Sequence, residues 1–321
     1  MIIGSDFQRE VLRAEERIRS YKRETYFQYS NYFSKKIDGD VYFKLENIQT
    51  TGSFKVRGAL NKLLTLKKSK RSNGVIAAST GNHGASVAYA ARELDIECTI
   101  YVPKESSTAK INNMKNFGAN IEIYGLDCVE AELKARRVSI QNDKTYVSPY
   151  NDHQVIVGQG TIGLEIAKQC TNLDAIIISV GGGGLISGVG SYLKSIWPNI
   201  KIIGCSPKNS AVMIHSIKKG ELTHIDSKPT ISDGTAGGVE DHSITFPVCC
   251  EIIDDVVLLT ETQIKKAMLS YIKEEHQLLE GAAGVAVGAL IKQQKNLKGK
   301  KVGVVICGGN ISIETLKKVI K

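Results

Sequence analysis

Short apolar runs alternate with longer segments of helical periodicity along most of the chain. The apolar runs predict strands at 41–46, 75–78, 98–102, 121–124, 175–179, 201–205, 255–259 and 302–306. The segments between or beside them predict helices at about 6–19, 54–67, 84–94, 107–117, 128–142, 158–170, 185–196, 211–219, 261–275, 281–294 and 312–320. Several of the strands are apolar throughout, which indicates burial on both faces and therefore mostly parallel sheets covered by helices. The sequence thus predicts a doubly wound α/β fold.

Glycines gather where several of these strands end. They occur at 81 and 84, 181–184, 234, 237–238 and 308–309. Ligands of open α/β sheets bind at the carboxyl ends of the strands. We therefore expect the glycine-rich strand ends to border one shared crevice.

Composition and charge exclude several classes of protein. The chain has 321 residues, 42% hydrophobic and 23% charged, which suits one large domain or two closely joined ones. Its net charge is +9, but the basic residues are dispersed, and the densest runs, 66–71 and 297–301, are predicted to be solvated loops. We expect small anionic substrates and no nucleic acid partner.

The cysteines and histidines show no metal-binding pattern. Seven cysteines are scattered without a CxxC pair, and six histidines lack HExxH spacing, so we expect no metal and free thiols in a reducing cytoplasm. Residues 1–18 carry charges too early for a signal peptide, and no apolar run approaches about 18 residues. The sequence predicts a cytoplasmic protein without membrane contact.

Two segments have the character of anion sites. "STGNHG" (79–84) lies between a strand and a helix, and helix N-termini bind anions. In "SVGGGGLISG" (179–188) four glycines separate a buried strand from a helix. It is neither a Walker loop nor GxGxxG, and no acidic residue follows 201–205 to bind a ribose, so a lone phosphate group is favoured over a dinucleotide. A tight turn without a ligand is the alternative.

Lys55 is a candidate nucleophile. It falls in the first turn of a predicted helix, after Phe54 and near Arg57. A helix N-terminus and a neighbouring arginine both disfavour the charged amine, which lowers the pKa of the lysine. Such a lysine can form an imine with a carbonyl compound. The alternative is an ordinary surface lysine.

These segments together resemble a known enzyme family. "TGSFKVRGA", "ASTGNHGASVAYAA" and "SVGGGGLISG", with "VGQGTIGLEI" and "VICGGNI", are similar to the serine/threonine dehydratase and serine racemase family of pyridoxal-phosphate enzymes. The resemblance spans nearly the whole chain, with the motifs in the family's order. It implies fold type II (tryptophan synthase β-like), with two doubly wound, mostly parallel sheets. The implied domains are a large cofactor-binding domain of 1–70 and 151–321 and a small mobile substrate-carboxylate domain of 71–150.

The resemblance also implies roles for individual residues. Lys55 would hold pyridoxal 5′-phosphate as a Schiff base and serve as the general base, and Asn82 would bond the 3′-oxygen. The remaining implied cofactor contacts are Phe54, Gly181, Gly182, Gly183, Gly184, Leu185, Glu280 and Cys307. The implied substrate contacts are Ser79, Thr80, Gly81, Asn82, His83, Tyr150 and Gly234.

The implied activity is dehydration and deamination of L-threonine or L-serine to 2-oxobutanoate or pyruvate and ammonia. Thr80 leaves racemisation open, because serine racemases carry a serine there; the alternative is that Thr80 caps the following helix. The alternative for Cys307 is a small buried apolar residue, and the alternative for Tyr150 is a core aromatic. Tyr150, and the absence of carboxylates in "CSPKNSAVM" (205–213), favour a dehydratase without a metal.

Two further hypotheses about the activity stay open. "ISDGTAGGVED" (231–241) resembles a branch acting on different β-hydroxy amino acids, such as 3-hydroxyaspartate or a hydroxyectoine-derived substrate. A non-catalytic paralogue that binds pyridoxal phosphate is a more remote hypothesis. The family resemblance suggests a homodimer.

Overall fold

Helices and strands alternate along residues 4–321, which the computed structural model describes. The α-helices are α1 (Ser5–Ile18), α2 (Asn31–Ile37), α3 (Lys55–Thr65), α4 (Lys68–Ser72), α5 (Asn82–Glu93), α6 (Thr108–Asn116), α7 (Cys128–Gln141), α8 (His153–Gln169), α9 (Gly184–Ile196), α10 (Val212–Lys219), α11 (Thr245–Ile252), α12 (Glu261–Glu275), α13 (Gly281–Lys292) and α14 (Ile313–Ile320). The strands are β1 (Phe27–Tyr29), β2 (Asp40–Leu45), β3 (Val75–Ala78), β4 (Cys98–Val102), β5 (Asn120–Ile123), β6 (Thr145–Tyr146), β7 (Ala175–Ser179), β8 (Lys201–Pro207), β9 (Asp255–Leu259) and β10 (Lys301–Ile306). Two short 3₁₀ helices are η1 (Glu46–Ile48) and η2 (Asp233–Thr235).

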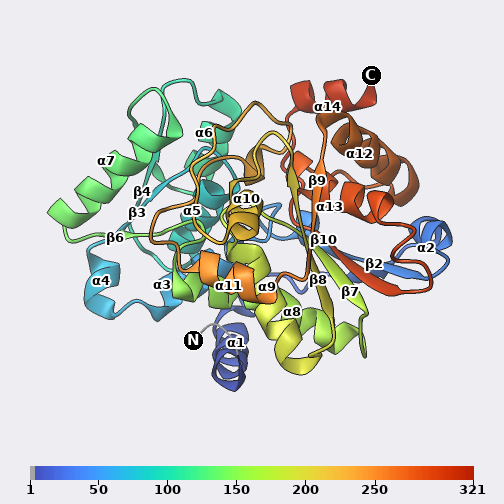
Figure 1. Ribbon diagram of the computed structural model, residues 1–321. Coiled ribbons are helices and arrows are strands. Elements are labelled where there is room, and N and C mark those ends of the chain that lie inside the picture. Colours follow the sequence, from blue (N-terminus) through green and yellow to red (C-terminus); the bar gives the residue numbers. More distant parts are fainter. Residues whose placement is uncertain (1–3) are drawn as a thin grey trace.

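The strands form two sheets side by side (Figure 1). The larger has the order β1-β2-β10-β7-β8-β9, and the smaller has the order β5-β4-β3-β6. Every pairing is parallel except that of β1 with β2. The predicted α/β fold with two mostly parallel sheets is therefore confirmed.

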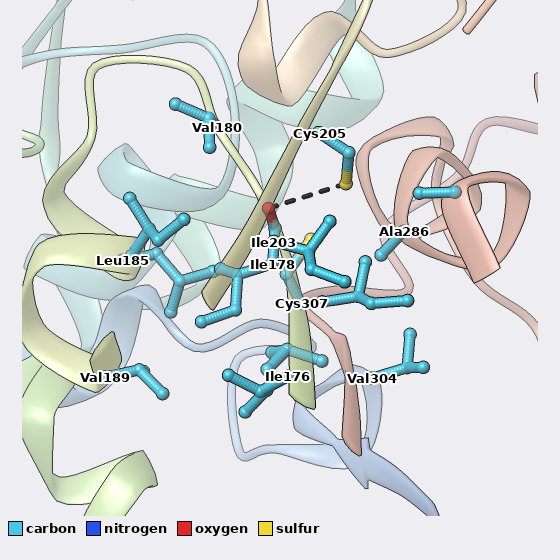
Figure 2. Close-up of a cluster of buried hydrophobic side chains, with 14 of the residues drawn as sticks. Ile176, Ile178, Val180, Leu185, Val189, Ile203, Cys205, Ala286, Val304 and Cys307 are labelled. Carbon is cyan, nitrogen blue, oxygen red and sulfur yellow. Dashed lines mark hydrogen bonds between the residues drawn. The ribbon is translucent and has the colours of Figure 1, made fainter. Parts of the chain in front are cut away.

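The core of the larger sheet explains its apolar strands. All five residues of β7 are buried, and Figure 2 shows Ile176 and Ile178 among side chains from β8, β10, α9 and α13. A strand covered on both faces needs no polar alternation. The cysteines are all free, and Cys98, Cys205, Cys249 and Cys307 are buried.

The sequence prediction missed several short elements. The run 66–71, expected to be a loop, overlaps α4, a short helix with no buried residue. The helix α2 is short and begins at a serine cap, with the hydroxyl of Ser30 accepting from Phe33 N at 3.2 Å. β1 and β6 have only three and two residues, and α11 was also missed. Strands of two or three residues give no recognisable period.

The smaller sheet is built only from residues 75–146, and the larger sheet takes its strands from both flanking parts of the chain. The domain boundaries at 70 and 150, and the mobility of the small domain, stay predictions. Residues 1–3, with which the predicted large domain begins, lie outside the described residues. Along 4–321 the structure has no helix that is both long and apolar enough to cross a membrane.

Candidate active site

The glycine segment links β7 to α9 and presents unused backbone donors. Gly183, with φ at +85°, precedes the helix, and no side chain caps α9. The first N–H of this turn with a backbone acceptor is that of Ser187, which donates to Gly183 O at 2.9 Å. Within residues 4–321, the N–H groups of 181–186 have no acceptor. The turn therefore has the donors that an anion needs.

Tyr150 packs directly on this turn. A Cβ atom on Gly182 would lie 2.5 Å from the Tyr150 ring, and one on Gly184 would lie 2.9 Å from Tyr150 Cβ. The Tyr150 hydroxyl accepts from Glu240 N at 2.9 Å, and Thr245 Oγ1 donates to Gly182 O at 2.6 Å. Only glycine leaves room for this close contact. Tyr150 therefore packs against the glycine turn and is not a residue of the apolar core.

Lys55 is the first residue of α3, and its amine points into the partly buried site. Its Nζ donates to Pro149 O at 2.8 Å and lies 5.2 Å from the centre of the Phe54 ring. Burial lowers the pKa of Lys55 to about 8, while Cys307 and Glu280 oppose the shift. Part of the Lys55 amine is therefore neutral near pH 7, whereas the amine of a surface lysine is almost fully protonated there.

The sequence suggested that Arg57 lowers the pKa of Lys55, and this is wrong. Its guanidinium is fully buried and donates to Glu46 at 2.7 and 2.8 Å and to Glu165 at 2.7 and 2.8 Å. Lys44 joins this cluster at 2.6 Å from Glu165. Residues two apart on a helix point in different directions, so Arg57 faces α8 and η1 and not the amine. The lowered pKa comes from burial.

Asn82 lies at the start of α5 and is held by hydrogen bonds from two directions. Its Nδ2 donates to both oxygens of Glu280, at 3.0 and 2.8 Å. Asn310 Nδ2 donates to Asn82 Oδ1 at 2.7 Å and to Thr51 O at 2.9 Å. The amide is thereby fixed in orientation between the two sheets.

Glu280 and Cys307 meet in the interior beneath this amide. Glu280 is 4% exposed, and burial raises its pKa to about 7. Cys307 Sγ lies 4.0 Å from Glu280 Oε1, and burial raises the pKa of the thiol well above its ordinary value. Cys307 follows β10 and also packs in the apolar cluster of Figure 2, so it is a buried thiol at the border of the site. Gly234 borders it too, since a Cβ there would lie 3.4 Å from Glu280 Oε1.

The start of α5 offers a second set of unused donors. The helix cap is Gly81 and no side chain caps it, so the capping role considered for Thr80 is wrong. Gly81 N donates to Ser79 Oγ at 3.2 Å, whereas the N–H groups of 82–84 have no acceptor within residues 4–321. The His83 side chain turns inward to Val147 O at 2.8 Å, and burial lowers its pKa to about 3. The charge of Lys55 lowers the pKa of His83 further, so the buried imidazole lies close to the site.

Sequence reasoning missed several residues that complete the site. Pro149 holds the amine of Lys55, Asn310 holds Asn82, and Thr245 holds the glycine turn. Asn310 follows the noted glycines 308–309, and this polar residue after a strand was the only signal available.

Comparisons with known proteins agree with this arrangement. The family described as "Pyridoxal-phosphate dependent enzyme" matches residues 18–308. The chain is 38% identical to the L-threonine ammonia-lyase of Thermotoga maritima, over 97% of this chain and 77% of that protein. It is 35% identical to the serine racemase of Dictyostelium discoideum, over 97% of each.

Solved structures show the same likeness in three dimensions. Maize serine racemase superimposes with a TM-score of 0.92 at 30% identity, over 100% of this chain and 97% of that one. The shared fold points to the same family as the lysine at the start of α3 and the two turns with unused donors. The chain belongs to the family of pyridoxal-phosphate-dependent enzymes.

Proposed function

We propose that this protein is an ammonia-lyase that converts L-threonine and L-serine to 2-oxobutanoate and pyruvate, with release of ammonia. One water is lost in the elimination and one is taken up in hydrolysis, so substrate and products balance. The observation that carries the proposal is a lysine amine of lowered pKa that shares its site with two sets of unused N–H donors. The threonine ammonia-lyase relative supports this reaction class.

The residues fit pyridoxal 5′-phosphate. The unused donors of 181–186 suit its phosphate, and the amine of Lys55 suits its aldehyde. When bound, the cofactor supplies an electron sink for negative charge at the substrate Cα.

The protein's own groups would bind the substrate and move the proton. The N–H groups of 82–84 would receive the substrate carboxylate at the N-terminus of α5. The neutral amine of Lys55 would then accept the Cα proton, a role suited to a base whose pKa is about 8. The Pro149 carbonyl, which accepts from Nζ at 2.8 Å, would orient the amine.

Cys307 favours elimination over transamination. Because its pKa is raised, the thiol stays neutral and offers at most a weak hydrogen bond to the cofactor's ring nitrogen. A carboxylate in its place would hold that nitrogen protonated. With Cys307 in this place the bound cofactor would be a weaker electron sink, which would favour loss of the β-hydroxyl over transamination.

The charges at the site favour a substrate with a single carboxylate. 3-Hydroxyaspartate would bring a second one, and Lys110, a cation close enough to influence Glu280, is already paired with Asp233 at 3.0 Å. Threonine and serine need no such partner.

Racemisation of serine is a second candidate, and Thr80 is the observation that favours it. Its hydroxyl caps no helix and has no hydrogen bond within residues 4–321, so it is free to act as an acid or base. The serine racemase relatives support this reaction as well. The comparison of Thr80→Ala with Thr80→Ser tests it: racemisation through Thr80 predicts loss of D-serine in the first variant and its retention in the second, with pyruvate formed by both.

The main test supplies the protein with pyridoxal phosphate and L-threonine, L-serine or 3-hydroxyaspartate, and measures 2-oxo acid and ammonia. Turnover of the first two is expected, and Lys55→Ala should abolish it. A protein that binds the cofactor but releases no oxo acid from any of these would be the non-catalytic paralogue instead. We also propose that the enzyme is a cytoplasmic homodimer. Sedimentation of the cofactor-bound protein would test the oligomeric state.

A further inference from the structure

Large apolar side chains lie exposed on the outer surface of the smaller sheet. They belong to β5, the following turn and α7, and they are between 44% and 82% exposed. They are Ile123, Tyr124, Leu126, Val129, Leu133 and Ile140. In Figure 1, α7 lies at the outer edge of the smaller sheet, on the side away from α12 and α13. Exposed apolar side chains that gather on one surface mark interaction sites.

The helix α7 does not need these side chains to pack on its own sheet. Its buried residues are the small Ala131, Ala135 and Ser139, at intervals of four, and they face the sheet. The larger apolar residues Val129, Leu133 and Ile140 are exposed on the side of α7 that faces away from the sheet. The exposed face is therefore surplus to the core of the small sheet.

Part of this face is hollowed. A depression of about 450 Å³ is lined by Ile123, Tyr124, Leu126 and Leu133 together with charged residues at its rim. This volume accommodates one or two side chains of a partner. The neighbouring strand β5 is the last strand of its sheet, so its outer edge is open to an extended segment.

The rim of the depression is positively charged. Lys104, Lys134 and Arg137 line it, and within residues 4–321 none of them pairs with a carboxylate. Lys134 Nζ lies 5.3 Å from the centre of the Tyr124 ring. The one lining carboxylate, that of Glu130, already accepts from Leu126 N at 2.7 Å. Three cations and one carboxylate thus surround an apolar floor, and the rim carries a net positive charge.

We propose that this face, which we call the α7 face (Lys104, Ile123, Tyr124, Leu126, Leu133, Lys134 and Arg137), docks an acidic extended segment of another protein. An apolar side chain of that segment fills the hollow, and flanking carboxylates pair with the three cations. Desolvated anchors with a charged rim are the usual anatomy of such interfaces.

A second copy of the chain and a membrane both match the face less well. A two-fold contact between two copies would bring the same cations together, and like charges oppose association. An anionic membrane attracts clusters of four to eight basic residues beside a helix, whereas this rim has three and surrounds a hollow.

The test uses the cofactor-bound protein and a labelled peptide in which aspartates and glutamates flank one leucine and one phenylalanine. Fluorescence anisotropy should show saturable binding that Arg137→Glu weakens about tenfold and Leu133→Ser also weakens. The matched control variants are Lys318→Glu and Ile313→Ser on α14, which remove the same kinds of exposed side chain elsewhere and should bind as the wild type does. Unchanged turnover of L-threonine in all four variants would show that they are folded.

Three outcomes would overturn the proposal. The first is no binding of the acidic peptide, or equal binding of a peptide with lysines in place of its acidic residues. The second is sedimentation that shows self-association lost in Arg137→Glu, which would make a second copy the occupant. The third is binding to phosphatidylserine vesicles through the same residues without peptide binding, which would make it a membrane surface.

Discussion

Replacement of Glu280 by glutamine should change how the stability of the protein depends on pH. Glu280 is 4% exposed, and burial raises its pKa from the ordinary 4.5 to about 7. A carboxyl group whose pKa is raised by folding binds its proton more tightly in the folded state. Its contribution to stability is therefore fully present below pH 4.5 and is lost as the pH rises through about 7.

The size of the effect follows from the interval between the two pKa values. One pKa unit corresponds to about 1.4 kcal/mol, so the interval from 4.5 to about 7 gives at most about 3 kcal/mol. Glutamine fills the same space and can still accept from Asn82, but it cannot ionise. The variant should therefore gain about 2–3 kcal/mol relative to the wild type between pH ~5 and pH ~8.

Urea unfolding at these two pH values, followed by circular dichroism, measures the difference. The cofactor must be removed first, because a bound ligand adds its own stabilisation. Glu274→Gln, which removes an exposed carboxylate, controls for the change in net charge. A stability difference between Glu280→Gln and wild type that is the same at both pH values would refute the reasoning.

Three further predictions concern Lys55, the glycine turn at 181–184 and the buried charged cluster around Arg57. In cofactor-free protein, the rate of reconstitution with pyridoxal phosphate should rise with pH through about 8, because the neutral amine of Lys55 is the nucleophile; stopped-flow absorbance measures it, and a flat profile would contradict the lowered pKa. Gly182→Ala should weaken cofactor binding about tenfold or more, because the added methyl would lie 2.5 Å from the Tyr150 ring; spectroscopic titration measures it, and wild-type affinity would show that the turn tolerates the methyl. Arg57→Met should cost about 3–5 kcal/mol in urea unfolding, since two buried carboxylates lose their partner; a loss under about 1 kcal/mol would mean that the cluster rearranges.

The sequence was most informative where burial imposes a strict pattern. The strands at 75–78, 98–102, 175–179 and 255–259 have the predicted bounds. The clearest case is 175–179, because a strand buried on both faces must be apolar from end to end. α4 was missed since it buries nothing and leaves no periodic signal.

Part of the candidate site also follows from local sequence pattern, and part does not. The position of Lys55 at a helix start, and the glycines 181–184 after a strand, follow from local pattern and are where the sequence placed them. The direction in which Arg57 points depends on Glu165, a neighbour distant in the chain.

The sequence by itself determined the class of fold, the lysine and the glycine turn, because strand burial and backbone clearance are local demands that restrict residue type directly. Only the tertiary structure decided that Asn310 fixes Asn82 on Glu280, that burial lowers the pKa of Lys55, and that Thr80 is left free. These depend on which side chains meet across two sheets and on how much water they lose there. Pairing and desolvation are properties of the assembled interior, and no spacing along the chain encodes them.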